Sequence, residues 1–184
     1  FKPETKLCVA VKANGYGNGA VQCAKAAKEA GADYLAIACV SEGIELRQNG
    51  IDLPLLMLSL CCPEEIPEVI KYSITPLIFD KEIIALYDEE LEKTGASSKF
   101  PVHMAVDTGM GRVGIRPDEA GEIASAIVDS KHLLLGGMCT HFAVADSLTD
   151  ENIDFTKEQF ESFKTAVECV KEKGIEPGIC SCGA

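Results

Sequence analysis

Five polar side chains follow apolar runs, at points where the sequence changes to turn residues: Lys12, Tyr16, Asp107, Arg112 and His141. Lys12 follows "LCVAV" directly and precedes the glycine-rich "ANGYGNG". An apolar wall disfavours the ammonium form of lysine and exposes a nucleophilic amine, which can form a Schiff base. A solvated surface lysine is the alternative, and Lys12 taken alone leaves both open.

Arg112 and His141 each allow two interpretations. Arg112 lies in "DTGMGRVGI", where three glycines permit tight turns before the next helix. Its guanidinium can hold a phenolate, carboxylate or phosphate, or it can pair with nearby Asp107. His141 follows an apolar run and either orients a neighbour through one ring nitrogen or is a satisfied histidine at the core edge.

Alternating strands and helices must position these residues. Apolar runs at 7–11, 34–40, 54–60, 74–79, 101–108 and 133–141 are followed by helix-like segments at 19–31, 41–50, 63–72, 80–95, 116–130 and 150–173. Asp80 is a natural N-cap for the fourth helix. A last strand-like segment, "GICSCGA", ends the sequence. The pattern predicts an α/β fold with six strand–helix units and the start of a seventh.

The alternation, with apolar runs that suit strands buried on both faces, fits an open doubly wound sheet and a barrel equally. The glycines after the first strand favour the barrel, because they are spaced G-x-G-x-G, unlike the dinucleotide fingerprint. We therefore predict a (β/α)8 TIM-barrel type, incomplete because a full barrel has eight units. In such barrels the chemistry lies at the carboxyl ends of the strands.

The amino-acid composition limits the kinds of partner that the protein can bind. The formal net charge of −12 over 184 residues repels nucleic acid and anionic lipid, so we expect neither as a partner. No segment has the roughly 18 apolar residues of a membrane span, and "FKPETK" lacks a signal-peptide pattern, so the expected compartment is the cytoplasm. We expect the nine cysteines, including Cys8, Cys39 and Cys139, to act as small buried hydrophobes, with no disulfide framework and no metal site.

Three motifs, in order, resemble those of the alanine racemase family. "VAVKANGYGNGA" resembles the pyridoxal-phosphate lysine motif, V-K-A-N/D-A-Y-G-H-G, "VDTGMGRVGI" is similar to the arginine motif, and "GGMCTHFAVAD" looks like the strand-end histidine motif. "SEGIELRQNG", "ITPLIF" and "DFTKEQFESF" also resemble family segments, so the resemblance covers essentially all 184 residues.

The resemblance implies a pyridoxal-5′-phosphate-dependent enzyme that interconverts L- and D-alanine and supplies D-alanine for peptidoglycan. It implies that Lys12 holds the cofactor as a Schiff base and serves as one of two bases at the substrate α-carbon. Tyr16 would bond the cofactor phosphate, Arg112 the phenolic oxygen, and His141 would support the cofactor ring. The cofactor delocalises the α-carbanion while the protein supplies bases and orientation.

The sequence departs from the family pattern at several positions. Ala105 stands where the family has a lysine, often carbamylated, that positions the arginine, and Asn18 replaces the histidine of Y-G-H-G. "CSCGA" matches the family's A-N-S-G/A-A, so the resemblance carries the phosphate-site positions onto Ser181 and Cys182. A thiol donates weakly, which predicts looser phosphate binding.

The family's C-terminal β-domain and its second base lie beyond residue 184. By resemblance, residues 1–184 are an N-terminal cofactor-binding barrel domain, partial, and the complete protein is a homodimer whose active site the partner completes. Residues 1–184 alone are expected to be inactive. Two alternatives stay open: a serine or broader-specificity racemase, and a non-catalytic barrel that carries pyridoxal phosphate.

Overall fold

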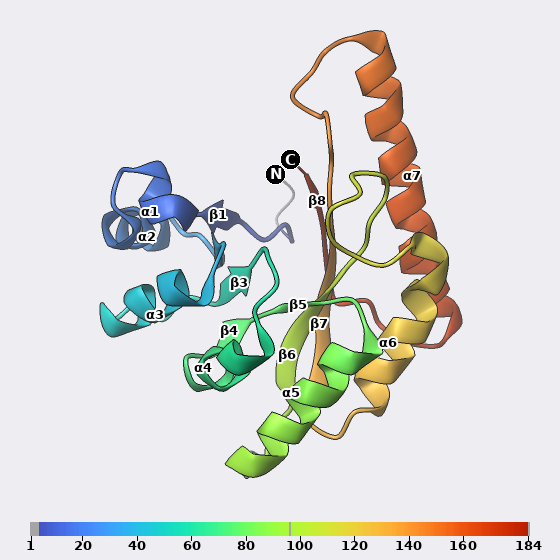
Figure 1. The fold of residues 1–184 in the computed structure, drawn as a ribbon. Helices are drawn as coiled ribbons and strands as arrows, with labels where there is room; N and C mark the ends of the chain where they lie inside the picture. The colour runs from blue at the N-terminus through green and yellow to red at the C-terminus, as the bar shows by residue number, and fades with distance from the viewer. Residues whose placement is uncertain (1–3, 96, 184) are drawn as a thin grey trace. The chain divides into compact units, whose positions relative to one another are not determined.

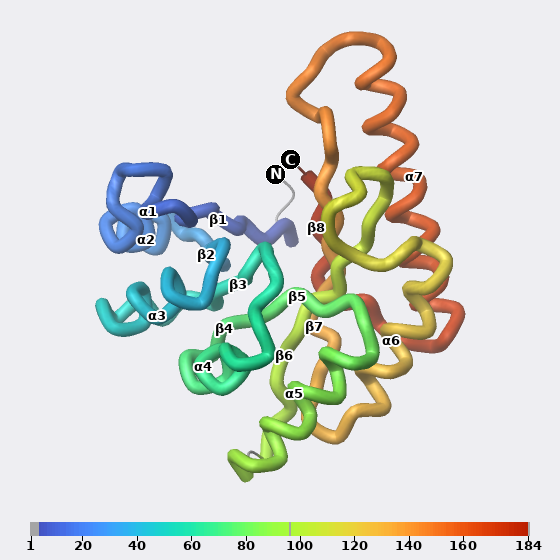
Figure 2. Tube along the Cα trace, in the orientation of Figure 1, coloured from blue at the N-terminus to red at the C-terminus, as the bar shows by residue number. Residues whose placement is uncertain are grey.

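The computed structural model describes residues 4–95 and 97–183 and shows an α/β fold (Figures 1 and 2). The strands form two four-stranded sheets, with the orders β1-β2-β3-β4 and β5-β6-β7-β8. The chain divides into two compact units, with the boundary between Leu77 and Ile78.

The first unit is a parallel sheet with its helices in the connections. Its strands are β1 (Cys8–Ala10), β2 (Tyr34–Ile37), β3 (Leu55–Met57) and β4 (Ile74–Thr75), and each pairs in parallel with the next. The connections hold α1 (Lys12–Tyr16), α2 (Ala20–Glu29), α3 (Val40–Gln48), η1 (Pro63–Glu65) and α4 (Ile66–Lys71). Buried strand side chains such as Leu35, Ile37 and Leu55 form its core.

The second unit follows the same plan. β5 (Leu77–Ile78) begins at the boundary, and β6 (Phe100–Ala105), β7 (Leu133–His141) and β8 (Ile179–Gly183) follow, with β7 paired in parallel to both β6 and β8. The helices are α5 (Lys81–Thr94), η2 (Pro117–Glu119), α6 (Ala120–Asp129) and α7 (Asp150–Glu172). In Figure 1, α6 and the long α7 run side by side. α7 buries one stripe at helical spacing: Gln159, Phe163, Ala166 and Val170.

Several elements differ from the sequence-based expectation. The strand expected at 74–79 is two strands, because Pro76 between them has no N–H to donate to a ladder. The strand expected at 34–40 ends at Ile37, and Cys39 is instead the extended residue that precedes α3. Asp80 caps α5 as predicted, accepting a 2.7 Å hydrogen bond from the backbone N–H of Ile83.

The expectation of buried cysteines was wrong for five of the nine, which are exposed: Cys8, Cys39, Cys62, Cys180 and Cys182. Cys139 is partly buried, and no disulfide joins any two of the nine cysteines, all of which lie in the described ranges. Within the described ranges there is no group of three or more His, Cys, Asp or Glu side chains placed to bind a metal ion. None of the helices in those ranges is both long and apolar enough to cross a membrane.

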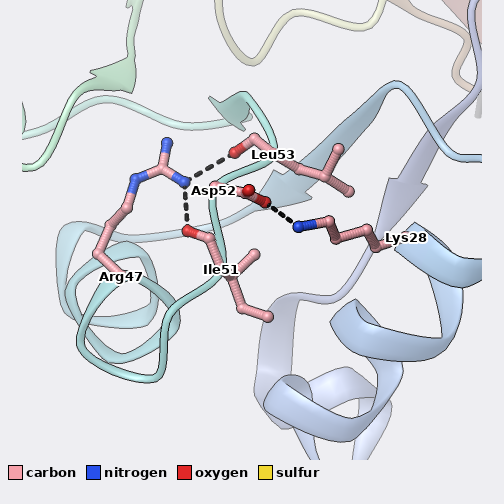
Figure 3. A network of polar contacts seen from close by, with 5 residues as sticks. All are labelled: Lys28, Arg47, Ile51, Asp52 and Leu53. Atoms are coloured by element: carbon pink, nitrogen blue, oxygen red, sulfur yellow. Dashed lines mark hydrogen bonds and ion pairs between the residues drawn. The ribbon is translucent and has the colours of Figure 1, made fainter.

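Arg47, at the end of α3, joins three segments of the first unit. Its Nη1 donates 2.7 Å hydrogen bonds to the carbonyls of Ile51 and Leu53, as Figure 3 shows. Its other nitrogens donate to the carbonyls of Tyr72 and Ser73, at 2.9 and 3.1 Å. One guanidinium therefore satisfies four backbone acceptors in the turns that lead into β3 and β4.

Candidate functional site

Lys12 begins a left-handed turn at the carboxyl end of the first strand. Val11 continues the β1 pairing through a 2.9 Å bond from its N–H to the carbonyl of Ala36, and its side chain is buried. The half-buried Lys12 follows, and then residues 13–17 all have positive φ, from 51° at Ala13 to 87° at Gly17. Left-handed geometry costs roughly 1–2 kcal/mol for each residue with a Cβ, so the turn needs outside support.

Two side chains supply that support. Glu42 of α3 accepts 2.7 Å hydrogen bonds from the backbone N–H of Ala13 and of Ala38, one with each carboxylate oxygen. Asn14 tolerates the left-handed region well, and its Oδ1 accepts a 2.9 Å bond from the N–H of Ala20 at the start of α2. The residue after Lys12 is therefore tied to the end of the neighbouring strand β2.

Tyr16, the other predicted cofactor contact of this unit, lies in the same turn, directly before Gly17. Tyr16 is 63% exposed, which leaves the residue accessible to a ligand. In the part of the chain that the structure describes, the Lys12 amine has no hydrogen bond or ion pair. An amine without an acidic partner, at the end of an apolar strand, suits covalent attachment to a carbonyl compound.

In the second unit, Arg112 lies exposed on a tightly closed loop. Asp107 Oδ1 accepts 3.0 Å hydrogen bonds from the N–H groups of Gly109 and Gly111, and Asp107 N–H donates to the carbonyl of Ile115. Gly114, at φ 119°, lies so close to the backbone of residues 105–107 that a Cβ would come within 2.6 Å of Asp107 N. The predicted alternative, an Arg112–Asp107 ion pair, is not formed: Asp107 shapes the loop instead.

The Arg112 guanidinium has no acidic partner among the residues that the structure places. The position where the resembling family has a lysine is Ala105, which is buried on β6 and paired with Cys139 of β7. Burial raises the pKa of the Cys139 thiol to about 12, so Cys139 supplies no anion at neutral pH. The guanidinium is therefore available for an external anion.

His141 ends β7, and the parallel pairing with β8 sets its neighbours. His141 pairs with Gly183, Thr140 with Cys182 and Cys139 with Ser181. Because paired residues share a face and consecutive residues alternate, Ser181 lies on the His141 face, whereas Cys182 lies on the Thr140 face. The two predicted phosphate-site residues are thus near His141 in the sheet but on opposite faces of it.

A buried amide connects the Arg112 loop with the end of β7. Gln159 of α7 is fully buried, and its Oε1 accepts a 3.0 Å hydrogen bond from the N–H of Ala143. Its Nε2 donates to Thr108 Oγ1 at 3.2 Å and, more weakly, to the carbonyl of His141 at 3.4 Å. Thr108 Oγ1 in turn shares a 2.9 Å hydrogen bond with Thr140 Oγ1.

The structure thus brings Lys12 and Tyr16 together in one unit, and His141, Ser181, Cys182 and the Arg112 loop together in the other. Sequence reasoning missed Glu42 and Gln159. Glu42 is the third helical residue of α3, where a carboxylate commonly caps a helix start, and that position was its one signal. Gln159 is the single polar member of the buried α7 stripe, which only a helical projection would have singled out.

The family model "Alanine racemase, N-terminal domain" matches residues 1–184. An alanine racemase of Treponema denticola is 47% identical over 174 residues, covering 95% of this chain and 45% of that protein. The chain spans about half the length of the curated relatives it matches.

Solved structures agree. Alanine racemase of Clostridium difficile 630 in complex with cycloserine is 36% identical, with a TM-score of 0.90 over 99% of this chain and 49% of that one. Alanine racemase of Bacillus anthracis with bound L-Ala-P is 31% identical, with a TM-score of 0.87 over 99% of this chain and 46% of that one. The α/β fold is thus of the (β/α)8 barrel type, and the chain is an incomplete part of it.

Proposed function

Because the chain belongs to the alanine racemase family, we propose that it is the cofactor-binding barrel part of an enzyme that interconverts L- and D-alanine with pyridoxal 5′-phosphate. The observation that carries the proposal is the turn at Lys12. The Lys12 amine, which has no partner within residues 4–95 and 97–183, stands at a strand end, in a left-handed turn that Glu42 and Asn14 hold in place. Strained backbone that the surroundings hold fixed is typical of functional sites.

The residues of the chain fit the cofactor's chemistry. Lys12 would attach to its carbonyl carbon, and the hydroxyl of the exposed Tyr16 would donate to its phosphate together with the β8 residues Ser181 and Cys182. The Arg112 guanidinium, which has no acidic partner within the described residues, would donate to the phenolic oxygen. His141, at the end of β7, would support the ring.

When bound, the cofactor withdraws electrons from the substrate α-carbon and so makes its proton acidic. The Lys12 amine, when it is not attached to the cofactor, would remove that proton from one face of the α-carbon or return it there. Racemisation requires a second base for the opposite face. We propose that residues outside this chain supply that base across a homodimer interface, and that the protein acts in the cytoplasm to supply D-alanine for peptidoglycan.

The first experiment tests attachment in the complete protein. With added pyridoxal phosphate, the wild type should develop a visible absorption band that borohydride removes, and mass spectrometry should then locate a pyridoxyl group on Lys12. Lys12→Ala should show neither signal. Lys25→Ala, at an exposed lysine of α2, is the matched control and should behave like the wild type. If borohydride fixes the pyridoxyl group to a different residue, or to no residue, the proposal fails.

The second experiment separates the remaining alternatives. Exchange of the α-proton with deuterated solvent and turnover are measured for L-alanine and L-serine. Faster racemisation of alanine supports the proposal, and faster racemisation of serine would identify the serine or broader-specificity enzyme. Attachment at Lys12 without α-proton exchange for either amino acid would identify a carrier protein.

A further inference from the structure

We infer that Gln159 is a positioning residue, one that holds the Arg112 loop and the His141 strand end in a fixed relation. The inference rests on the proposed function, because it assigns Gln159 a task in the same site. Gln159 lies on α7, away from the reacting groups, and acts only through the backbone and side chains of the two segments that carry them.

The hydrogen bonds of the amide reach both segments. Oε1 accepts from Ala143 N–H, two residues after His141, and Nε2 donates to Thr108, four residues before Arg112. The second Nε2 donor points to the His141 carbonyl at 3.4 Å. The amide therefore uses both kinds of group it has, donor and acceptor, and a side chain with only one kind cannot replace it.

Two further contacts strengthen this connection. The hydroxyls of Thr108 and Thr140 lie 2.9 Å apart and share a hydrogen bond, which links the Arg112 loop directly to β7. Phe155, one turn before Gln159 on α7, packs against Gly109, where a Cβ would lie 3.1 Å from its ring and 3.8 Å from Gln159 Cγ. The loop is thus held against α7 by an aromatic contact and a buried amide.

Other contacts within the loop fix the position of Arg112 relative to Thr108. The Val106–Ile115 bridge closes its base, Gly114 packs on the backbone of residues 105–107, and Asp107 accepts from two loop N–H groups. A loop so tightly closed moves as one piece. Displacing Thr108 therefore displaces Arg112 relative to His141.

The test uses the complete protein loaded with pyridoxal phosphate and the variant Gln159→Leu, which keeps the approximate volume and removes every hydrogen bond of the amide. We expect kcat for alanine to fall by up to about 100-fold, since misplacement by about 1 Å can cost that much. KM should change far less, and the absorption band of the bound cofactor should shift, because Arg112 no longer meets the phenolic oxygen correctly. The control for lost stability is Val170→Ala, on the same buried stripe of α7 but distant from the Arg112 loop and from the end of β7.

Hydrogen–deuterium exchange without cofactor gives a second readout. Residues 107–112 and 141–145 should exchange faster in Gln159→Leu, and at the wild-type rate in Val170→Ala. Gln159→Glu keeps the acceptor for Ala143 but loses the donors when ionised. Its kcat relative to wild type should therefore recover as the pH falls and the carboxyl group gains a proton that it can donate.

A double-mutant cycle with Thr108→Val isolates the link itself. Since both changes break the same connection, the double variant should lose little more activity than Gln159→Leu alone. The inference would be overturned if the double variant lost activity by the product of the two single losses. It would also be overturned if Gln159→Leu and Val170→Ala changed kcat and the absorption band equally. Either outcome would leave the racemase assignment intact. If the wild type neither attaches the cofactor nor racemises, the proposed function fails, and the exchange experiment alone then decides whether Gln159 fixes the two loops.

Discussion

Glu42 shows how one carboxylate can maintain a strained turn. It accepts from Ala13 N–H, which directly follows Lys12, and from Ala38 N–H after β2, so that it couples two adjacent strand ends. Without it, two backbone donors lose their partners, and the left-handed residues lose one of the two side chains that support them. The position of the Lys12 amine therefore depends on a residue thirty positions further along the chain.

Replacing Glu42 with alanine should lower the free energy of unfolding by about 1–3 kcal/mol, because two N–H groups lose their acceptor. It should also reduce the fraction of Lys12 that borohydride fixes to pyridoxal phosphate. Denaturant unfolding and mass spectrometry measure the two effects. Glu45→Ala, at an exposed position of the same helix, is the control, and equal losses in both variants would contradict this role for Glu42.

Burial of His103 makes the free energy of unfolding depend on pH. His103 is buried on β6 with its ring against Gly137, where a Cβ would lie 2.6 Å from the ring, and its Nδ1 has no partner within the described residues. Burial lowers the pKa of His103 from 6.5 to about 4. The folded state therefore keeps the ring neutral at pH values where the unfolded chain binds a proton.

Because the folded pKa lies below the unfolded one, stability is complete above about pH 6.5 and declines as the pH falls toward 4. The decline from this residue should approach about 3 kcal/mol. Denaturant unfolding at several pH values should show it in the wild type, with the corresponding part missing in His103→Gln. Parallel stability curves for the two proteins would rule out a buried neutral His103.

At the scale of elements, Arg47 and Lys28 illustrate two kinds of charged contact within Figure 3. Arg47 is partly buried and donates to carbonyls in the turns before β3 and β4. Lys28 pairs with Asp52 at the surface, with 47% and 72% of their side chains exposed. Planar, forked donors suit several fixed acceptors, whereas an exposed pair is screened by water.

Arg47→Lys should therefore lower the free energy of unfolding by roughly 1–3 kcal/mol, since an ammonium group cannot reach four carbonyl acceptors in two separate segments at once. Lys28→Ala should leave that free energy nearly unchanged. Denaturant unfolding of the two variants beside the wild type measures the contrast. A larger loss in Lys28→Ala than in Arg47→Lys would reverse this assignment.

At the scale of the whole molecule, the chain matches only about half of each relative's length. Racemisation needs a base on each face of the α-carbon, and we propose the Lys12 amine as one of them. We expect residues 1–184, produced alone, to show no alanine racemase turnover, while the complete protein shows it. Circular dichroism should verify that the shorter protein is folded, and robust turnover by it would contradict the expectation.

The sequence by itself determined the alternation of strands and helices, the helix cap at Asp80 and the strand-end placement of Lys12 and His141. These features depend on local patterns: apolar runs, helical spacing and turn residues close together in the chain. The same local logic failed at Pro76, where one missing N–H split a strand, and at Cys39, where the strand ended early.

Only the tertiary structure decided what holds the candidate site together. Glu42 reaches a backbone N–H twenty-nine residues away, and Gln159 reaches a hydroxyl fifty-one residues away. Asp107 could have paired with Arg112, but loop closure turned its carboxylate toward the backbone. Such choices depend on which donors and acceptors meet once the chain has folded, and a buried polar group takes whichever partner the packing brings within reach.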